Sequence, residues 1–245
     1  MIEIRDLHKS FGDNHVLRGI DLTVEEGKTT VIIGASGSGK SVLMKHMIGL
    51  LRPDSGKVVV DGLDTSELGE RELAKVRQKF GMVFQNAALF DSMTVGENVA
   101  FPLREHRRLP EKEIRRIVEE KLRVVDLEGV EHLYPAELSG GMRKRVGLAR
   151  AVVLDPRIVL YDEPTTGLDP ITANSVDEMI LAAQERLGVT SVVISHDIAS
   201  SFRVGDHIAM IYKGQIVEQG PPEKLMESDH PYVKKFLGTW FAKGK

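Results

Sequence analysis

An eight-residue stretch, GASGSGKS, carries glycines, a lysine and a serine at a spacing suited to phosphate binding. The spacing G-x-x-x-x-G-K-[ST] is met by Gly34, Gly39, Lys40 and Ser41. In such a loop the glycines let successive backbone N–H groups point at phosphate oxygens, and the following helix adds the positive end of its dipole. Lys40 is expected against the β- and γ-phosphates of a nucleotide, and Ser41 on Mg²⁺. Four further residues are expected to line the same phosphates: Ala35, Ser36, Gly37 and Ser38. The stretch predicts nucleotide binding, although kinases, GTPases and motor ATPases all share it.

Two adjacent carboxylates end a second informative stretch, IVLYDE. Asp162, at the end of the predicted strand, is placed to reach the Mg²⁺ shell. Glu163 can project toward the γ-phosphate and orient a water for in-line attack. Adjacent carboxylates are also common in solvated acidic turns, so the pair alone supports both interpretations.

Two more polar residues follow predicted strands. His196 ends VVISH, at the edge where α/β sheets bind ligands, and could hydrogen-bond to the γ-phosphate. Gln85 follows GMVF, and its amide could reach Mg²⁺ and the attacking water. A histidine or glutamine at a strand end is also an ordinary structural or exposed residue, so neither decides the function.

A second glycine-rich stretch, LSGGM, occupies residues 138–142. Ser139 and the two glycines after it would expose N–H groups at the start of a helix that carries Arg143, Lys144 and Arg145. This arrangement predicts a second anion site. The plainer alternative is that Ser139 is an N-cap in front of a glycine turn.

These stretches lie between elements that predict an α/β fold. Short runs rich in Val and Ile, such as TTVIIG, RIVLYDEP and SVVISH, alternate with helical stretches, which favours a mostly parallel sheet. The first strands and the later MIYKGQIVEQG resemble antiparallel hairpins instead. A P-loop core with an antiparallel β subdomain is expected over residues 1–85 and 155–245, and an inserted helical subdomain over about 86–154. Within the helical part, one apolar stripe is predicted: Ile114, Ile117, Val118, Leu122 and Val125.

The composition of the chain argues against several classes of protein. The 245 residues fit a single domain, and the net charge of −3 gives no reason to expect nucleic acid as a partner. The absence of cysteine excludes disulfides and thiolate metal sites. The apolar runs are shorter than the roughly 18 residues of a membrane span, and the charged, alternating N-terminus predicts a strand and not a signal peptide. We therefore expect a soluble chain whose membrane role, if it has one, comes through another chain.

Taken in order, the motifs resemble those of the ATP-binding cassette (ABC) ATPases, the motor subunits of ABC transporters. The resemblance covers nearly the whole chain: Walker A at 34–41, the Q-loop at Gln85, the signature at 138–142, Walker B at 158–163, the D-loop at 166–169 and the H-loop at His196. It implies ATP and Mg²⁺ as cofactors and ATP hydrolysis as the activity.

The resemblance also implies roles for individual residues. The catalytic set is Glu163, His196, Lys40 and Gln85, and the metal ligands are Ser41, Gln85 and Asp162. The signature, acting in trans on the ATP of a second copy, is Leu138, Ser139, Gly140, Gly141 and Met142, and the D-loop carries Asp169. The chain is therefore expected to work as a homodimer with two sandwiched ATP molecules.

The base of the nucleotide needs an aromatic partner in this family. Phe11 is the candidate for stacking on adenine, where tyrosine is more usual, and Val16 would pack nearby. Phenylalanine keeps the π face and loses the hydroxyl. The alternative is that Phe11 belongs to the core of the hairpin.

A permease is the expected membrane partner. Residues 86–103 supply apolar side chains for a groove that would accept a helix of the permease: Leu89, Phe90, Met93, Val95 and Phe101, with Asp91 and Glu97 at the rim. Some of these side chains must instead fill the core. The expected location is the cytoplasmic face of the inner membrane, peripheral through the permease.

Among ABC ATPases, QNAALFDSMTVGENVAFPL and LSGGMRKRVGLARA are most similar to the ATPase of the Mla/Mce-associated transporters, which handle phospholipids. This similarity implies lipid cargo and leaves room for a Mce-type lipid-binding protein as a further partner. One alternative is the ATPase of an amino-acid or other small-solute importer. Another is a soluble ABC ATPase unconnected with transport, which the single uninterrupted cassette and the lack of basic excess disfavour.

Overall fold

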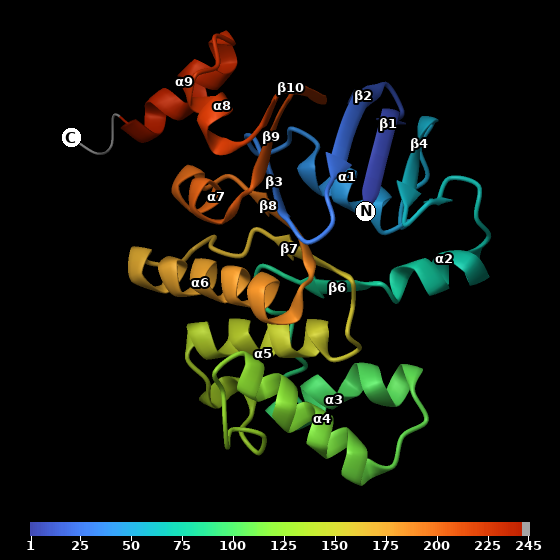
Figure 1. Ribbon diagram of the computed structural model, residues 1–245, viewed down its shortest axis with the longest axis vertical. Coiled ribbons are helices and arrows are strands. Elements are labelled where there is room, and N and C mark those ends of the chain that lie inside the picture. The colour runs from blue at the N-terminus through green and yellow to red at the C-terminus, as the bar shows by residue number, and fades with distance from the viewer. Residues whose placement is uncertain (242–245) are drawn as a thin grey trace. The chain divides into compact units, whose positions relative to one another are not determined.

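The computed structural model describes residues 1–241, and its elements are labelled in Figure 1. The chain divides into two compact units. The first unit comprises residues 1–77 and those from 190 onward, and the second comprises residues 78–189. The division into a core and a helical subdomain at about 86–154 stays a prediction.

An antiparallel sheet forms one part of the first unit. Its strands, in spatial order, are β2 (Asn14–Val24), β1 (Ile2–Phe11), β4 (Ser55–Val60) and β5 (Leu63–Asp64). Each neighbouring pair is antiparallel, as expected for the first strands. Apolar side chains of these strands, such as Ile2, Ile4 and Leu22, are fully buried because one face of the sheet covers a core.

The second sheet region of the first unit is mainly parallel. β3 (Thr29–Ile33) pairs in parallel with β8 (Thr190–Ser195) on one side and β9 (His207–Tyr212) on the other, and β10 (Gln215–Gly220) returns antiparallel to β9. Every residue of β3 and β8 is buried, which explains their continuous apolar character. The helices of this unit are α1 (Lys40–Met47), α2 (Glu70–Arg77), α7 (Ile198–Val204), α8 (Pro222–Met226) and α9 (Pro231–Phe241).

The second unit combines two parallel strands with four α-helices. β6 (Phe80–Val83) pairs with β7 (Ile158–Asp162). The helices are α3 (Val95–His106), α4 (Glu111–Val124), α5 (Gly140–Val152) and α6 (Pro170–Leu187), with a 3-10 turn at Pro135–Glu137. α3 and α4 both pack on α5 (Figure 1). The predicted stripe of α4 faces inward, with Ile114, Val118 and Leu122 buried and Ile117 half-buried.

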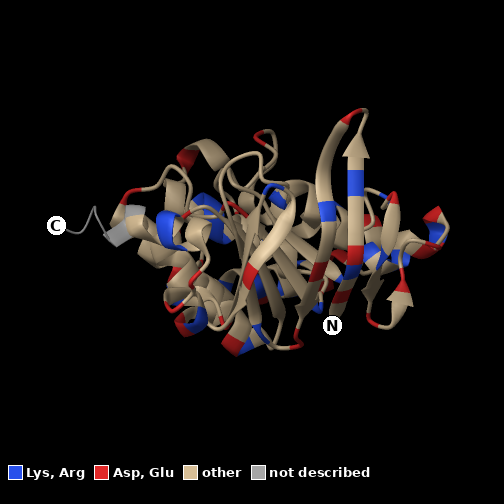
Figure 2. Cartoon of the chain, turned by 90° about the horizontal axis from the view of Figure 1, so that it is seen from above, with Lys and Arg blue, Asp and Glu red and all other residues tan. Residues whose placement is uncertain are grey.

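Charged residues of both signs are interspersed along β1 and β2 (Figure 2), in keeping with the small net charge of the chain. Among the described helices, none combines the length and the apolar character needed to cross a bilayer.

Candidate functional site

The phosphate-binding loop lies between a buried strand and a helix, as its spacing predicts. β3 ends at Ile33 and α1 begins at Lys40. Gly37 and Gly39 have φ values of +75° and +109°, a region that favours glycine. A Cβ atom on Gly39 would lie 2.8 Å from Cδ2 of Leu17, so a side chain there would also collide with β2. Local conformation and packing both require glycine at this position.

Two polar side chains of this loop, those of Lys40 and Ser38, are buried and form what we call the cradle. Four other residues predicted for this site are exposed: Ala35, Ser36, Gly37 and Ser41. The Lys40 ammonium is largely buried and donates hydrogen bonds to the carbonyl oxygens of Gly34, at 2.8 Å, and Ala35, at 3.2 Å. The Ser38 hydroxyl is buried and has no hydrogen-bond partner among the described residues. A buried hydroxyl without a partner is costly, and a phosphate oxygen would accept a hydrogen bond from it. The cradle therefore fits the phosphate chain of a nucleotide.

His196 and the phosphate-binding loop leave the sheet at the same edge. β3 and β8 run parallel with Ile33 opposite Ser195, so Gly34 and His196 each begin the segment after a paired strand end. The His196 side chain is exposed.

Phe11 closes the hairpin of β1 and β2, where it pairs with Asn14. Its side chain is 49% exposed, so it is not a core residue of the hairpin. Val16 lies further along β2, and its carbonyl oxygen would be 3.2 Å from a Cβ atom on Gly39. β2 thus passes the end of the phosphate-binding loop.

In the second unit, the predicted carboxylates and Gln85 also share one edge. β6 and β7 run parallel with Val83 opposite Tyr161. Gln85 therefore follows the end of β6 beside the end of β7, where Asp162 is the last strand residue and Glu163 comes next. Gln85 is exposed and both carboxylates are half-buried.

The backbone at Glu163 adopts an unusual conformation. Its φ of +51° lies in the left-handed region, which few residues other than glycine occupy. Thr166 closes the turn: its hydroxyl donates to the Glu163 carboxylate at 3.0 Å, and its N–H donates to the Glu163 carbonyl at 3.3 Å. Strained non-glycine residues persist where the surroundings fix them, and such residues cluster at active sites.

The LSGGM stretch opens α5. Ser139 is the N-cap, and its hydroxyl accepts a hydrogen bond from the N–H of Met142 at 3.2 Å. Leu138 is buried, Ser139 and Gly140 are exposed, and Gly141 and Met142 are half-buried. A Cβ atom on Gly141 would meet nothing within 4 Å, so space is open beside it.

Only one of the three basic residues of this helix stays beside its N-terminus. Arg143 donates to the carbonyl of Leu138, directly before the N-cap, whereas Lys144 and Arg145 donate to the carbonyls of Pro164 and Val125. Burial lowers the pKa of Lys144 below its usual value. All three basic side chains donate to backbone carbonyls, and the anion site at the start of α5 stays a prediction.

Two further residues organise the loops around these motifs. Asp169 caps α6 by accepting hydrogen bonds from the N–H groups of Ile171 and Thr172, and the bond from the Thr172 hydroxyl is the main cause of its lowered pKa. Arg150, which the sequence did not single out, donates to the carbonyls of Ala87 and Ala88 at 2.6 and 2.8 Å.

Known proteins are similar to this chain in sequence and in fold. A family model described as ABC transporter matches residues 17–166. The chain belongs to the ABC transporter family. The resemblance drawn from the sequence is therefore confirmed, and so is the α/β fold of an ABC ATPase cassette.

Two curated ABC relatives and one solved structure are especially informative. A probable ribonucleotide transport ATP-binding protein of Mycobacterium bovis is 46% identical over 96% of this chain, which spans 66% of that relative's length. An intermembrane phospholipid transport system ATP-binding protein of Haemophilus influenzae is 42% identical over 97% of this chain and 90% of its own. A dimeric cassette in a post-hydrolysis state, bound to ADP and Pi, is 32% identical with a TM-score of 0.80, over 91% of this chain and 99% of its own.

The segment predicted to dock a permease in this ABC protein divides between core and surface. Val95 is fully buried and belongs to the core, whereas Phe90 is 43% exposed. Leu89, Met93 and Phe101 are half-buried, and the Phe90 and Phe101 rings lie 5.0 Å apart. Apart from Val95, the predicted apolar residues thus remain at least partly accessible.

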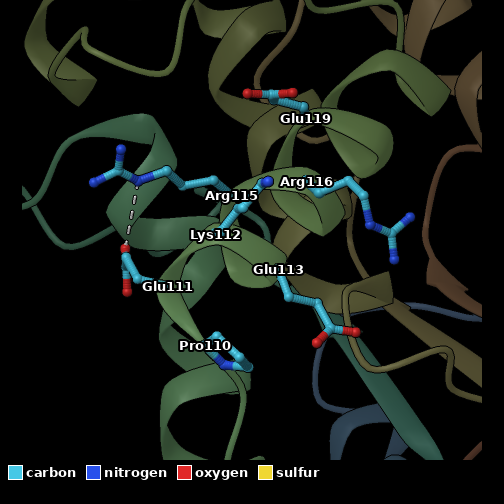
Figure 3. A pocket seen from close by; sticks show the side chains of 7 residues that line it. All are labelled: Pro110, Glu111, Lys112, Glu113, Arg115, Arg116 and Glu119. Carbon is cyan, nitrogen blue, oxygen red and sulfur yellow. Dashed lines mark ion pairs between the residues drawn. The ribbon is translucent and has the colours of Figure 1, made fainter.

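A hollow of about 820 Å³ lies elsewhere on this ABC protein, and its lining side chains are drawn in Figure 3. All its lining residues belong to the start of α4 and the proline before it: Pro110, Glu111, Lys112, Glu113, Arg115, Arg116 and Glu119. Glu111 and Arg115 form an ion pair at 3.9 Å. None of the predicted site residues lines this hollow.

Proposed function

We propose that this chain is the ATP-hydrolysing motor subunit of an ABC transporter, and that ATP-driven closure of its dimer powers phospholipid transport through a separate permease. The observation that carries the proposal is the buried cradle of Lys40 and the unpartnered Ser38 hydroxyl at the end of β3. It supplies the donors that a nucleotide's phosphates require.

Within one chain, the cradle would bind the phosphates and Phe11 would stack on adenine beside Val16. Ser41, Gln85 and Asp162 would supply oxygen ligands, the type that Mg²⁺ prefers. When bound, Mg²⁺ neutralises charge that develops on the phosphates. Glu163 would accept a hydrogen bond from the attacking water, and His196 would hydrogen-bond to the γ-phosphate.

The second copy of the chain would complete the site. The exposed N-cap at Ser139 and the open space beside Gly141 leave the start of α5 accessible to an anion. A two-fold dimer would then hold two equivalent ATP molecules, each between the cradle of one chain and the signature of the other. Loss of the γ-phosphate would remove that bridge and open the dimer. The solved relative is dimeric, which supports the pairing of two chains in this proposal.

The permease would dock on the accessible part of residues 86–103. Asn98 supports this segment from inside: its amide donates to the carbonyls of Phe90, Met93 and Thr94 at 3.0–3.1 Å. Arg150 lies 5.7 Å from the Phe90 ring while it holds the loop after Gln85. A displacement of Phe90 by the permease would thus be transmitted through Arg150 to the loop that follows Gln85. The chain would lie peripherally on the cytoplasmic face of the inner membrane.

Phospholipid is the proposed cargo, and a Mce-type lipid-binding protein is a proposed further partner. The support comes from the Haemophilus relative, whose name refers to phospholipid transport and which this chain matches over 90% of its length. The name of the Mycobacterium bovis relative refers instead to ribonucleotide transport, but this chain spans only 66% of that protein.

The experiment is to co-express the chain with its permease and to measure ATP hydrolysis in nanodiscs with and without added phospholipid. Phospholipid should stimulate hydrolysis. Phe90→Glu and Met93→Glu should remove the stimulation and leave ATP binding intact. The control Tyr134→Glu, on another exposed aromatic, should keep the stimulation.

Two results would contradict the proposal at different points. A complex that responds only to a soluble amino acid, nucleotide or ion would exclude lipid as cargo. Full stimulation in the Phe90 and Met93 variants would exclude this docking segment and leave the cargo untouched.

A further inference from the structure

We infer that Lys144 is a positioning residue for the Glu163 carboxylate. Its Nζ donates a hydrogen bond to the carbonyl of Pro164, the residue directly after Glu163. Lys144 lies on α5 and Pro164 in the turn after β7, so this contact joins two segments distant in sequence. The inference rests on the role proposed for Glu163 in hydrolysis.

The turn at Glu163 needs support from outside itself. The left-handed backbone conformation costs free energy for a residue that has a side chain. Such a conformation persists only where neighbouring groups fix it. Thr166 fixes one side through the Glu163 carboxylate and carbonyl. Lys144 fixes the other through the next peptide group, so the carboxylate sits on a backbone held at two points.

The buried ammonium group of Lys144 requires a hydrogen-bond partner. Its side chain is only 7% exposed, and an ammonium group withdrawn from water is costly unless a specific partner compensates. Its neighbour Arg145 also donates to a carbonyl, but its side chain is more exposed and its partners, Val125 and Asp126, do not belong to the turn at Glu163. Arg145 is therefore a matched control on the same helix.

The contact has a mechanical consequence. α5 begins at the Ser139 N-cap, which is proposed to touch the ATP of the partner, and one turn later carries Lys144. A shift of this helix when the dimer closes would move the Pro164 carbonyl and, with it, Glu163. One helix would thus connect the signature of one site with the catalytic carboxylate of the other.

The first test is Lys144→Met, which keeps the apolar stem and removes the donor. We expect kcat for ATP hydrolysis to fall by about 10- to 100-fold, since small misplacements of a catalytic group have effects of this order. The ATP dissociation constant, measured by calorimetric titration, should remain unchanged. Arg145→Met should leave kcat unchanged.

The natural chain contains no cysteine, which allows a chemical rescue. Lys144→Cys would be alkylated in the unfolded state and refolded, beside wild-type protein taken through the same cycle. An aminoethyl group on sulfur restores an ammonium at the length of lysine, whereas a propyl group restores only the length. The aminoethyl form should recover kcat and the propyl form should not. The comparison of the two alkylated forms tests the role of the Lys144 ammonium group even if Lys144→Met fails to fold.

Wild-type kcat in Lys144→Met, a parallel loss of ATP affinity, or equal activity of the two alkylated forms would overturn the inference. Glu163→Gln, measured alongside, separates this outcome from failure of the proposed function. If Glu163→Gln turns over normally, the role of Glu163 is wrong. If Glu163→Gln is inactive and Lys144→Met is fully active, only the role of Lys144 is wrong.

Discussion

Replacing Phe11 with alanine should weaken ATP binding without disturbing the fold. A phenylalanine side chain offers about 200 Å² of surface, and with 49% exposed roughly half of it is open to a ligand. An adenine ring on one face would cover about 50 Å², which at about 25 cal/mol per Å² contributes ~1 kcal/mol, or roughly a 5-fold change in Kd. The phosphate contacts remain, so binding should be weakened and not abolished.

The assay is calorimetric titration of Phe11→Ala, Phe11→Tyr and wild type with ATP and with GTP. Phe11→Tyr should bind as wild type, because it keeps the stacking face. Phe11→Ala should lose affinity for ATP and discriminate less between the two bases. Tyr134→Ala, at a comparably exposed aromatic, is the control and should change nothing. An unchanged ATP titration in Phe11→Ala would refute the stacking role.

Three other changes test separate parts of the structure. Ser139→Ala combined with Gly141→Asp should abolish hydrolysis while single chains still bind ATP, since the new carboxylate has room and repels the γ-phosphate; full activity would contradict a role of the signature in trans. Gly39→Ala should lower stability by about 1–3 kcal/mol from backbone strain alone, seen as a lower Tm, and an unchanged Tm would contradict the need for glycine. Burial lowers the pKa of His46, so the stability it contributes is present above about pH 6.5 and lost as pH falls from there through its folded-state pKa. His46→Gln should flatten the fall of Tm below pH 6.5, and an unaltered slope would contradict this assignment.

The spacing of local motifs predicted the elements that carry them. The phosphate-binding loop lies between a strand and a helix because glycine spacing, a buried strand and a helix start are all encoded within a few residues. The burial of the α4 stripe followed from helical periodicity in the same way.

Contacts between distant segments could not be predicted. Arg143, Lys144 and Arg145 are identical in charge, and nothing in their order indicates that only Lys144 is buried and reaches Pro164. The left-handed backbone at Glu163 could not be predicted either, because no glycine marks this position and the conformation depends on contacts with other residues. Periodicity also left open which residues of 86–103 fill the core, and packing decided this for Val95.

We propose that ATP is held between two copies of this chain and that Glu163 directs its hydrolysis. The most direct measurement is the mass and nucleotide content of Glu163→Gln purified with ATP and Mg²⁺, by light scattering and chromatography of the released nucleotide. Removal of the carboxylate should leave the phosphate contacts and stop hydrolysis, so a stable dimer with two ATP per dimer is expected. A monomer that holds ATP would contradict the shared ATP site. Hydrolysis by the variant at the wild-type rate would contradict the role of Glu163.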